Sequence, residues 1–327
     1  MSFWSGRRVL VTGGCGFIGS YLVEALLDDG ALVSVLGRYN SRSDKGFIAH
    51  IESPNLEVHL GDVSDLTLVR GVVSGMDTIF HLAALIGIPY SYVAPIHYVE
   101  TNIKGTVAVL EAARAAGVRR VVHTSTSENY GSAQYTPIDE RHPLVGQSPY
   151  SATKIGADKM AESYHRSFGL PVAILRPFNT FGPRQSLRAV IPTAMAQALY
   201  APEIRVGSLN PVRDMNFVSD TVAGFLGLGA ADDVDGETFN VGSGKGRSIG
   251  EILEAVQRVA GTAKPVVVQD ERIRPPDSEV EELVCDFTRA RQTFGYQPRV
   301  EFEEGLAAVR DYLAAHPPIS DVSIYRV

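Results

Sequence analysis

The chain has 327 residues, 45% of them hydrophobic and 20% charged, which excludes a disordered protein and allows one large core with a smaller lobe. A formal net charge of -7 without any Lys/Arg block argues against a sequence-independent nucleic-acid binder. No apolar run approaches the roughly 20 residues that span a bilayer. Cys15 and Cys285 stand far apart, without metal-ligand spacing. We therefore expect a cytoplasmic protein without a metal, membrane or nucleic-acid partner.

The first structural unit expected from the sequence is a βαβ unit. Residues 8–12 form a short apolar run without alternation, which is typical of a parallel strand covered on both faces. A glycine cluster follows, then helical spacing of apolar residues over 20–27 and a second strand over 31–36.

The same rhythm continues through the first half of the chain. Strand candidates at 56–60, 78–82, 121–124 and 172–175 alternate with helical segments at about 65–72, 99–116 and 150–168. This alternation predicts an α/β fold with a doubly wound parallel sheet.

After residue 177 prolines interrupt short elements, which indicates a second lobe. The strand-like residues 237–241 are expected to return to the first sheet. The predicted division is a dinucleotide-binding (Rossmann) domain over 1–176 with 215–242 returning to it. The predicted smaller lobe is 177–214 with 243–315, and a peripheral tail covers 316–327.

The glycine cluster lies between the first strand and the first helix, where a dinucleotide-binding loop would be. Gly13 permits the tight turn, Gly16 lets the backbone approach a pyrophosphate, and Gly19 lets helix and strand pack closely. The amino end of the helix then offers N–H groups to the phosphates.

The end of the second strand bears on the choice between NAD and NADP. An acidic residue that would accept from a ribose 2′-hydroxyl does not stand there, and Gly37-Arg38 can receive a 2′-phosphate instead. The sequence therefore favours NADP over NAD. Asp62, after the third strand, is placed to touch adenine or, alternatively, to cap the next helix.

A tyrosine and a lysine four residues apart, Tyr150 and Lys154, begin a predicted helix and share one of its faces. A nearby ammonium should lower the pKa of the phenol from its usual value of about 10. Tyr150 could then take a proton from a sugar hydroxyl while the hydride of that carbon leaves for nicotinamide.

With the glycine loop, Thr126, Tyr150 and Lys154, the chain resembles an extended short-chain dehydrogenase/reductase of the epimerase/dehydratase family over essentially its whole length. The resemblance implies a nucleotide-sugar substrate, a tightly bound NAD(P), and a homodimer through helices 99–116 and 150–168. It implies that these residues contact the cofactor: Gly13, Gly16, Phe17, Ile18, Gly19, Arg38, Asp62, Val63, Leu82, Ala83, Ala84, Asn102, Tyr150, Lys154 and Pro177. The residues implied to contact substrate are Ile88, Asn179, Arg184, Val190, Arg213, Arg274 and Glu279.

Thr126-Ser127-Glu128 resembles the Thr-Ser-Glu of GDP-mannose 4,6-dehydratases and predicts a dehydration. Oxidation at C4 makes the C5 proton acidic, Glu128 removes it as the C6 hydroxyl departs, and the hydride returns to C6. Ser127 stands where related dehydratases carry Asp, so Glu128 would serve as base and acid. Asn129 replaces a residue that is commonly apolar.

Segments 85–92 and 146–150 resemble N-acetylglucosamine 4,6-dehydratases of the legionaminic-acid type, with UDP or GDP as the nucleotide. Three other readings stay open. A UDP-glucuronic acid decarboxylase would need a cation such as Arg184 or Arg188, and a 4-epimerase would not need Glu128. A remote alternative is a non-catalytic NAD(P) sensor, and Glu128 could also be only a helix cap.

Overall fold

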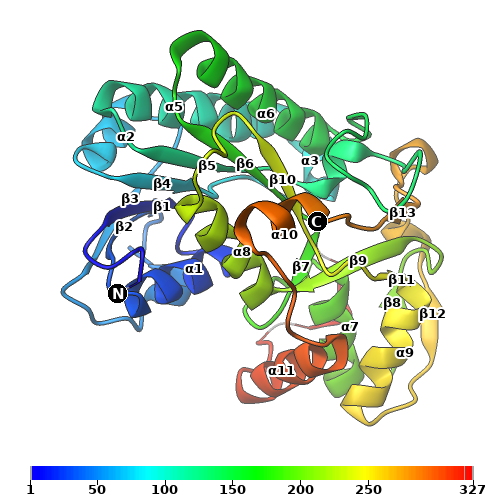
Figure 1. Cartoon of the computed structure of the whole chain (residues 1–327). Coiled ribbons are helices and arrows are strands. Elements are labelled where there is room, and N and C mark those ends of the chain that lie inside the picture. Colours follow the sequence, from blue (N-terminus) through cyan, green and yellow to red (C-terminus); the bar gives the residue numbers. More distant parts are fainter. Residues whose placement is uncertain (1, 320, 326–327) are drawn as a thin grey trace.

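A parallel sheet forms the centre of the molecule in the computed structural model, which describes residues 2–319 and 321–325. It has seven strands in the order β10-β6-β5-β4-β1-β2-β3, and each neighbouring pair is parallel (Figure 1). The predicted α/β doubly wound sheet is thereby confirmed. The strands are β1 (Arg8–Thr12), β2 (Leu32–Arg38), β3 (Leu56–Gly61), β4 (Thr78–His81), β5 (Arg120–Thr124), β6 (Val172–Pro177) and β10 (Thr238–Val241).

Helices cover both faces of this sheet. Along β1, Val9 and Val11 pack into one apolar core and Leu10 into the other, because successive side chains of a strand point to opposite faces. The first core is closed by α1 (Phe17–Asp28), α8 (Val218–Ala230) and α10 (Thr288–Phe294). The second is closed by α2 (Leu66–Val73), α5 (Gly105–Ala116) and α6 (Pro149–Phe168), as Figure 1 shows.

The predicted helix at 99–116 is composite in the structure. A π-helical stretch, η2 (Val99–Lys104), precedes α5, and two short helices, α3 (Ile88–Val93) and α4 (Pro95–Tyr98), come before it. Asn102 in η2 bonds to Leu85 and to Thr153 of α6, so the wide turn places its amide between a loop and a neighbouring helix. Apolar periodicity does not reveal this side-chain link.

A second group of elements has its own core, formed by α7 (Val190–Tyr200), α9 (Ile249–Ala260) and α11 (Phe302–Ala315). Strand β9 (Val212–Phe217) pairs with β11 (Gly246–Ser248), β13 (Glu282–Leu283) and β7 (Asn179–Phe181), and β8 (Ile204–Val206) pairs with β12 (Val266–Val268). The short helical turns are η1 (Gly46–Ile48), η3 (Ser127–Tyr130), η4 (Asp270–Arg272) and η5 (Pro276–Ser278).

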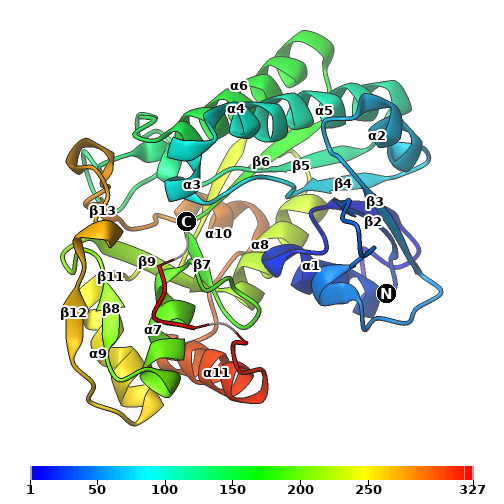
Figure 2. The same ribbon diagram turned by 180° about the vertical axis from the view of Figure 1, so that it is seen from behind.

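The chain crosses between the two groups more than once. After β9 it re-enters the large sheet through α8 and β10, and Thr238 of β10 pairs with Ile174 of β6. Figure 2 shows the second group, with α7, α9 and α11, gathered below the large sheet. The crossings place the carboxyl ends of β5 and β6 beside the second group.

Residues 321–325, expected to belong to a peripheral tail, lie against the second group. The Val322 carbonyl accepts a 2.9 Å hydrogen bond from Gln197 of α7, and Arg272 donates to the Ser323 carbonyl at 3.0 Å. The Arg272 guanidinium also lies 4.9 Å from the centre of the Tyr325 ring.

Candidate active site

The glycine loop joins β1 to α1 and leaves backbone N–H groups available. Gly13 has φ of +73°, and a Cβ there would lie 2.9 Å from the Ala83 nitrogen; a Cβ on Gly19 would collide with the Gly13 carbonyl. A Cβ on Gly16 would meet the same carbonyl at 3.3 Å, which is a tight contact, so a side chain there would crowd the loop. No side chain within the described chain caps α1, so its first turn can bind an anion.

Arg38 is the exposed last residue of β2. The strand residue before it is tightly packed, because a Cβ on Gly37 would lie 2.5 Å from Cys15 Sγ. Asp62 accepts a 2.8 Å hydrogen bond from the Ser64 backbone, which is the main cause of its lowered pKa, and the charge of Arg38 acts in the same direction. The alternative that Asp62 caps the next helix is wrong, since Asp65 caps α2.

Tyr150 and Lys154 lie in the first turns of α6, which begins with a capping box between Ser148 and Ser151. Tyr150 is 7% exposed and Lys154 is 4% exposed. Lys154 Nζ donates to the Thr124 carbonyl at the end of β5, at 2.5 Å. The helix start and the strand end therefore bring both side chains to the carboxyl edge of the sheet.

Burial decides how these two groups titrate. It raises the pKa of Tyr150; a hydrogen bond with Thr126 acts against this, and the charge of Glu128 adds to it. The prediction that Lys154 lowers this pKa is not met, because the ammonium is turned to Thr124. Burial lowers the pKa of Lys154 itself to about 8, against the favourable charge of Asp158.

Glu128 lies in η3, directly after the end of β5. Thr126 caps this turn by accepting from the Glu128 backbone at 3.3 Å, so the cap is Thr126 and not the Glu128 carboxylate. Glu128 is 8% exposed and Ser127 is buried. Thr126, Glu128 and Tyr150 thus form one cluster.

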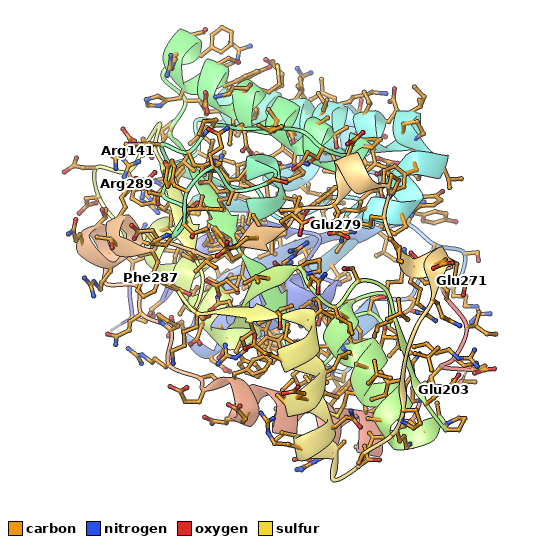
Figure 3. All side chains as sticks on the ribbon, turned by 90° about the vertical axis from the view of Figure 1, so that its right-hand side faces the viewer. Arg141, Glu203, Glu271, Glu279, Phe287 and Arg289 are labelled. Carbon is orange, nitrogen blue, oxygen red and sulfur yellow. The ribbon has the colours of Figure 1, made fainter. Side chains whose placement is uncertain are left out.

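Two arginines face this cluster from the second group. Arg213 Nη2 lies 3.1 Å from Glu279 Oε1, and Arg274 Nη1 lies 3.5 Å from the same oxygen and 3.9 Å from Glu128 Oε2. Arg274 Nη1 is buried and has no hydrogen-bond partner within the described ranges. Figure 3 shows Glu279 near the middle of the molecule and Glu271 at its edge. Two guanidinium groups therefore stand beside Glu128, and the Glu279 carboxylate offsets part of their charge.

The segment that carries Arg274 and Glu279 is fastened close to Tyr150. Ser278 Oγ donates to the Gln147 carbonyl at 2.7 Å and lies 2.5 Å from Tyr92 Oη, and Gln147 Nε2 donates to the Asp277 carbonyl at 3.1 Å. Gln147 precedes α6, so the position of this segment is coupled to the start of the tyrosine-bearing helix.

The remaining residues expected to contact the cofactor surround the glycine loop and α6. Leu82 and Ala83 follow β4 and bond to Thr12, and Val63 packs on Gly105. Asn102 uses its amide oxygen and nitrogen for Leu85 and Thr153, so it supports the Leu82–Leu85 loop. Ala84 lies in that loop, Phe17 and Ile18 open α1, and Pro177 ends β6.

The residues expected to contact substrate are only partly brought together. Ile88 packs with Tyr98 and Tyr150, and Asn179 Oδ1 in β7 is buried without a hydrogen-bond partner among the described residues. Arg184 instead pairs with Glu24 of α1 at 2.9 Å. Val190 begins α7 and packs against the second core.

Sequence reasoning missed two groups beneath the site. Asp158 is fully buried and receives hydrogen bonds from three elements. Its spacing, four residues after Lys154, is a signal for a shared helix face. His123, also fully buried, has its Nε2 3.2 Å from Asp158 Oδ1.

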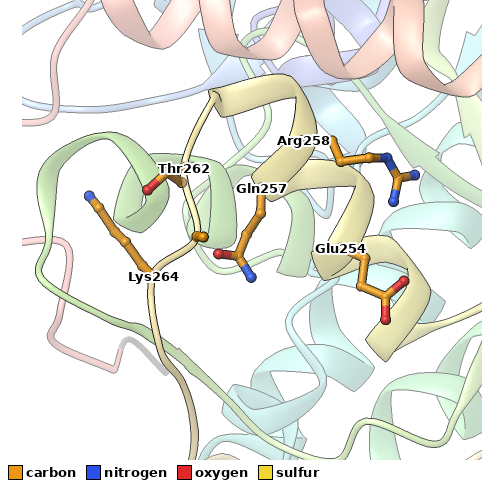
Figure 4. A pocket seen from close by; sticks show the side chains of 6 residues that line it. Glu254, Gln257, Arg258, Thr262 and Lys264 are labelled. Carbon is orange, nitrogen blue, oxygen red and sulfur yellow. The ribbon is translucent and has the colours of Figure 1, made fainter.

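Other sites in the described chain offer less. A shallow pocket on α9, lined by residues such as Glu254, Gln257 and Lys264, contains none of the predicted site residues (Figure 4). Within residues 2–319 and 321–325, His, Cys, Asp and Glu form no group suited to a metal ion. No described helix is long and apolar enough to span a bilayer.

The fold, the glycine loop and the Tyr-Lys pair define a short-chain dehydrogenase/reductase, and comparison with known proteins narrows the class. The model of the GDP-mannose 4,6 dehydratase family matches residues 10–309. The low-salt glycan biosynthesis protein Agl12 of Haloferax volcanii is 34% identical over 93% of this chain and 97% of that protein. The UDP-glucose 4-epimerase of Mycolicibacterium smegmatis is 34% identical over 93% of this chain and 98% of that enzyme.

A solved structure agrees with these relatives. The dTDP-glucose 4,6-dehydratase DesIV from Streptomyces venezuelae, with NAD and TYD bound, has a TM-score of 0.85 at 31% identity, covering 94% of this chain and 97% of that one. The chain belongs to the NAD-dependent epimerase/dehydratase family of short-chain dehydrogenases/reductases, which confirms the resemblance.

Proposed function

We propose that the protein is an NAD(P)-dependent nucleotide-sugar 4,6-dehydratase acting on a UDP- or GDP-linked N-acetylhexosamine. The observation that carries the proposal is the buried Glu128 carboxylate, which acts electrostatically on Tyr150 and lies 3.9 Å from Arg274. Elimination needs a base besides the one that serves oxidation, and Glu128 can supply it. The match to the GDP-mannose 4,6 dehydratase family supports a nucleotide sugar as substrate, and the resemblance of segments 85–92 and 146–150 is the ground for an N-acetylhexosamine.

In the first half-reaction, Tyr150 accepts the proton of the C4 hydroxyl while Thr126 holds that hydroxyl. Lys154 does not contact the neutral phenol, since its ammonium donates to the Thr124 carbonyl. Its positive charge, buried on the same helix face, would still favour the phenolate as that forms. A nicotinamide held at the glycine loop would supply the redox chemistry, as acceptor of the C4 hydride and donor of a hydride to C6.

In the second half-reaction, Glu128 removes the C5 proton, which the C4 carbonyl has made acidic. The C5–C6 double bond forms as the C6 hydroxyl departs with a proton. Ser127 has no carboxyl group, so the protonated Glu128 is the acid that supplies this proton. Water is lost from the sugar, and as the hydride adds to C6, C5 takes up a proton that balances the one released from the C4 hydroxyl, so no net oxidant is consumed.

The glycine loop fits a dinucleotide because Gly16 carries no side chain over the backbone and no described side chain caps the first turn of α1. Arg38, exposed at the end of β2, favours NADP over NAD. Arg213 and Arg274 would bind the substrate diphosphate, with Asn179 and Glu279 beside them. Arg184, paired with Glu24 next to the glycine loop, fits the cofactor side better than the substrate side.

The remaining organisation is proposed on the same basis. Residues 1–176 with 215–242 form the cofactor domain, and 177–214 with 243–315 form the substrate lobe. A homodimer would use the outer faces of η2, α5 and α6. The cytoplasmic location stays a prediction.

The nearest rival is a UDP-glucuronic acid decarboxylase. Arg188 lies beside Tyr98, whose pKa it lowers against the effect of burial, so a cation does exist near the tyrosines. Arg184, the other cation considered, is engaged by Glu24. A 4-epimerase needs only the Tyr-Lys half of the site, and an NAD(P) sensor needs neither half.

Product mass separates these functions. The cofactor-loaded protein is mixed with UDP-N-acetylglucosamine, GDP-N-acetylglucosamine, UDP-glucuronic acid or UDP-glucose. Loss of water from an N-acetylhexosamine substrate is the expected result. Loss of carbon dioxide, or an unchanged mass with an inverted C4, contradicts dehydration; no turnover of any substrate contradicts every enzymatic version.

A further inference from the structure

Asp158 occupies the same face of α6 as the two residues of the redox half-reaction. Tyr150, Lys154 and Asp158 follow at four-residue steps, which stacks them along one side of a helix. Asp158 is 0% exposed. A carboxylate at this depth persists only when hydrogen bonds or opposite charges replace its hydration.

The Asp158 carboxylate is bonded to three other elements. Its Oδ2 accepts from Ser125 Oγ at 2.6 Å, from Asn129 Nδ2 at 3.0 Å and from Arg176 Nη2 at 2.9 Å. His123 Nε2 lies 3.2 Å from Oδ1. The partners come from the end of β5, from η3 and from β6, so a single carboxylate joins these elements to α6.

Two of these partners bracket the Thr126–Glu128 turn. Ser125 precedes Thr126, and Asn129 follows Glu128. The Asn129 amide donates to both Ser125 Oγ, at 3.1 Å, and Asp158. The distance between Glu128 and Tyr150 therefore depends on hydrogen bonds to Asp158 from both ends of the turn.

Asp158 also provides the negative charge that favours protonated Lys154. The other titratable groups near Lys154 act differently. His81 on β4 and His123 on β5 are fully buried, and burial lowers the pKa of each. Arg176 on β6 is a cation, and Tyr150 is neutral while protonated. Burial opposes a charged Asp158, but the His123 ring beside it and the charge of Arg176 hold its pKa well below the usual range.

We propose that Asp158 is a positioning residue: it keeps Lys154 charged against the Thr124 carbonyl and, through Ser125 and Asn129, fixes Glu128 relative to Tyr150. This inference rests on the proposed function. It assigns Asn129, the amide in a commonly apolar position, the role of linking the Glu128 turn to the tyrosine helix.

The decisive variants are Asp158→Asn and Asn129→Val. Asp220→Asn is the matched control, because Asp220 is another buried carboxylate that accepts a backbone hydrogen bond, from Val300, on a different helix. Single-turnover reduction of the bound cofactor is followed against pH, and C5 exchange is followed in deuterium oxide. Circular dichroism checks that each variant is folded.

The rate of cofactor reduction is expected to fall at high pH, and we call this fall the alkaline limb. In Asp158→Asn, the alkaline limb should lie about one pH unit or more lower, because removal of an opposite charge shifts the pKa of the buried Lys154 by this order. For Asn129→Val, the limb should stay in place while C5 exchange falls at least about tenfold relative to C4 oxidation, the size of a modest loss of positioning. Asp220→Asn should leave both unchanged. The proposal would be overturned if folded Asp158→Asn had its alkaline limb at the wild-type pH and the wild-type ratio of C5 exchange to C4 oxidation.

Two further measurements keep the test decisive. If Asp158→Asn does not fold, Asn129→Val with a wild-type exchange ratio overturns the positioning role. C4 oxidation is common to dehydration, decarboxylation and epimerisation, so the pH arm does not depend on which product forms. If no sugar is oxidised, the proposed function fails; NMR titration of ¹⁵N-labelled Lys154 then tests the charge role, and an unchanged Lys154 titration in Asp158→Asn overturns it.

Discussion

Lys154 donates a hydrogen bond from its ammonium group to the Thr124 carbonyl and so links α6 to the end of β5. The pKa of this lysine is lowered by burial to about 8, so the charged form is lost as pH rises through that value. Wild-type cofactor reduction should therefore fall above about pH 8. In Lys154→Arg, cofactor reduction should not fall above about pH 8, because the guanidinium stays protonated. The variant should react more slowly than wild type, because the pocket is shaped for an ammonium. If the rate of Lys154→Arg fell at the same pH as that of wild type, the fall would belong to another titrating group.

Removing the Tyr150 hydroxyl should abolish oxidation while the protein still folds. Tyr150→Phe should reduce single-turnover cofactor reduction by about 10²–10⁴-fold, the usual contribution of a general base. The absorbance of the reduced nicotinamide measures the extent of cofactor reduction. Tyr164→Phe, on the same helix but bonded to Glu111, is the control and should be close to wild type. Normal turnover by Tyr150→Phe contradicts the assignment.

Glu128→Gln should separate the two half-reactions. C4 oxidation should continue because Tyr150 and Lys154 remain, but exchange of the C5 proton with deuterium oxide should fall by about 10²-fold or more. Mass spectrometry of recovered substrate gives the exchange. Glu140→Gln, which alters a carboxylate bonded to the Asn240 backbone, controls for loss of a partly buried charge. Undiminished exchange in Glu128→Gln removes Glu128 from the base role.

The end of β2 should determine cofactor preference. Arg38→Ala should weaken NADP binding by about 10–100-fold, the equivalent of one charge-assisted hydrogen bond, and leave NAD binding nearly unchanged. Calorimetric titration of the cofactor-free protein measures both. Arg70→Ala, an exposed arginine on α2, should change neither affinity. Equal losses for NADP and NAD would show that Arg38 does not contact a 2′-phosphate.

The buried Asp158–Arg176 pair should make stability depend on acid. Because the pKa of Asp158 is held below its ordinary value of about 3.9, its contribution is complete above that pH and is lost as pH falls toward the folded-state value. Asp158→Asn should cost about 3–5 kcal/mol at pH 7, as for one partner of a buried pair. Denaturant unfolding at several pH values measures this, and a variant with the wild-type slope below pH 4 contradicts it.

Much of the fold follows from local sequence. The unbroken apolar run of β1, the glycines after it and the amphipathic spacing of α1 each depend on neighbours in the chain. Tyr150 and Lys154 are predictable for the same reason, since their separation matches one helical turn. The capping box of Ser148 and Ser151 places the start of that helix close to where the pattern indicates.

The less predictable features depend on residues distant in sequence. Arg184 could not be assigned to Glu24 because the pair joins α1 to the loop after β7. The network on Asp158 draws donors from β5, η3 and β6, and no sequence spacing relates them. The pKa of Tyr150 was mispredicted because the lysine's direction depends on the Thr124 carbonyl, which belongs to a neighbouring strand.

Strand β10 has a consequence for how the chain folds. Until residues 238–241 are available, β6 is an unpaired edge of the sheet, and the Tyr130 hydroxyl lacks its 2.8 Å bond to Asn240. Exposed strand edges invite pairing between chains. A fragment that ends before β10 should therefore aggregate. During synthesis, residues 177–214 of the second group leave the ribosome before β10 can pair with β6 and complete the large sheet.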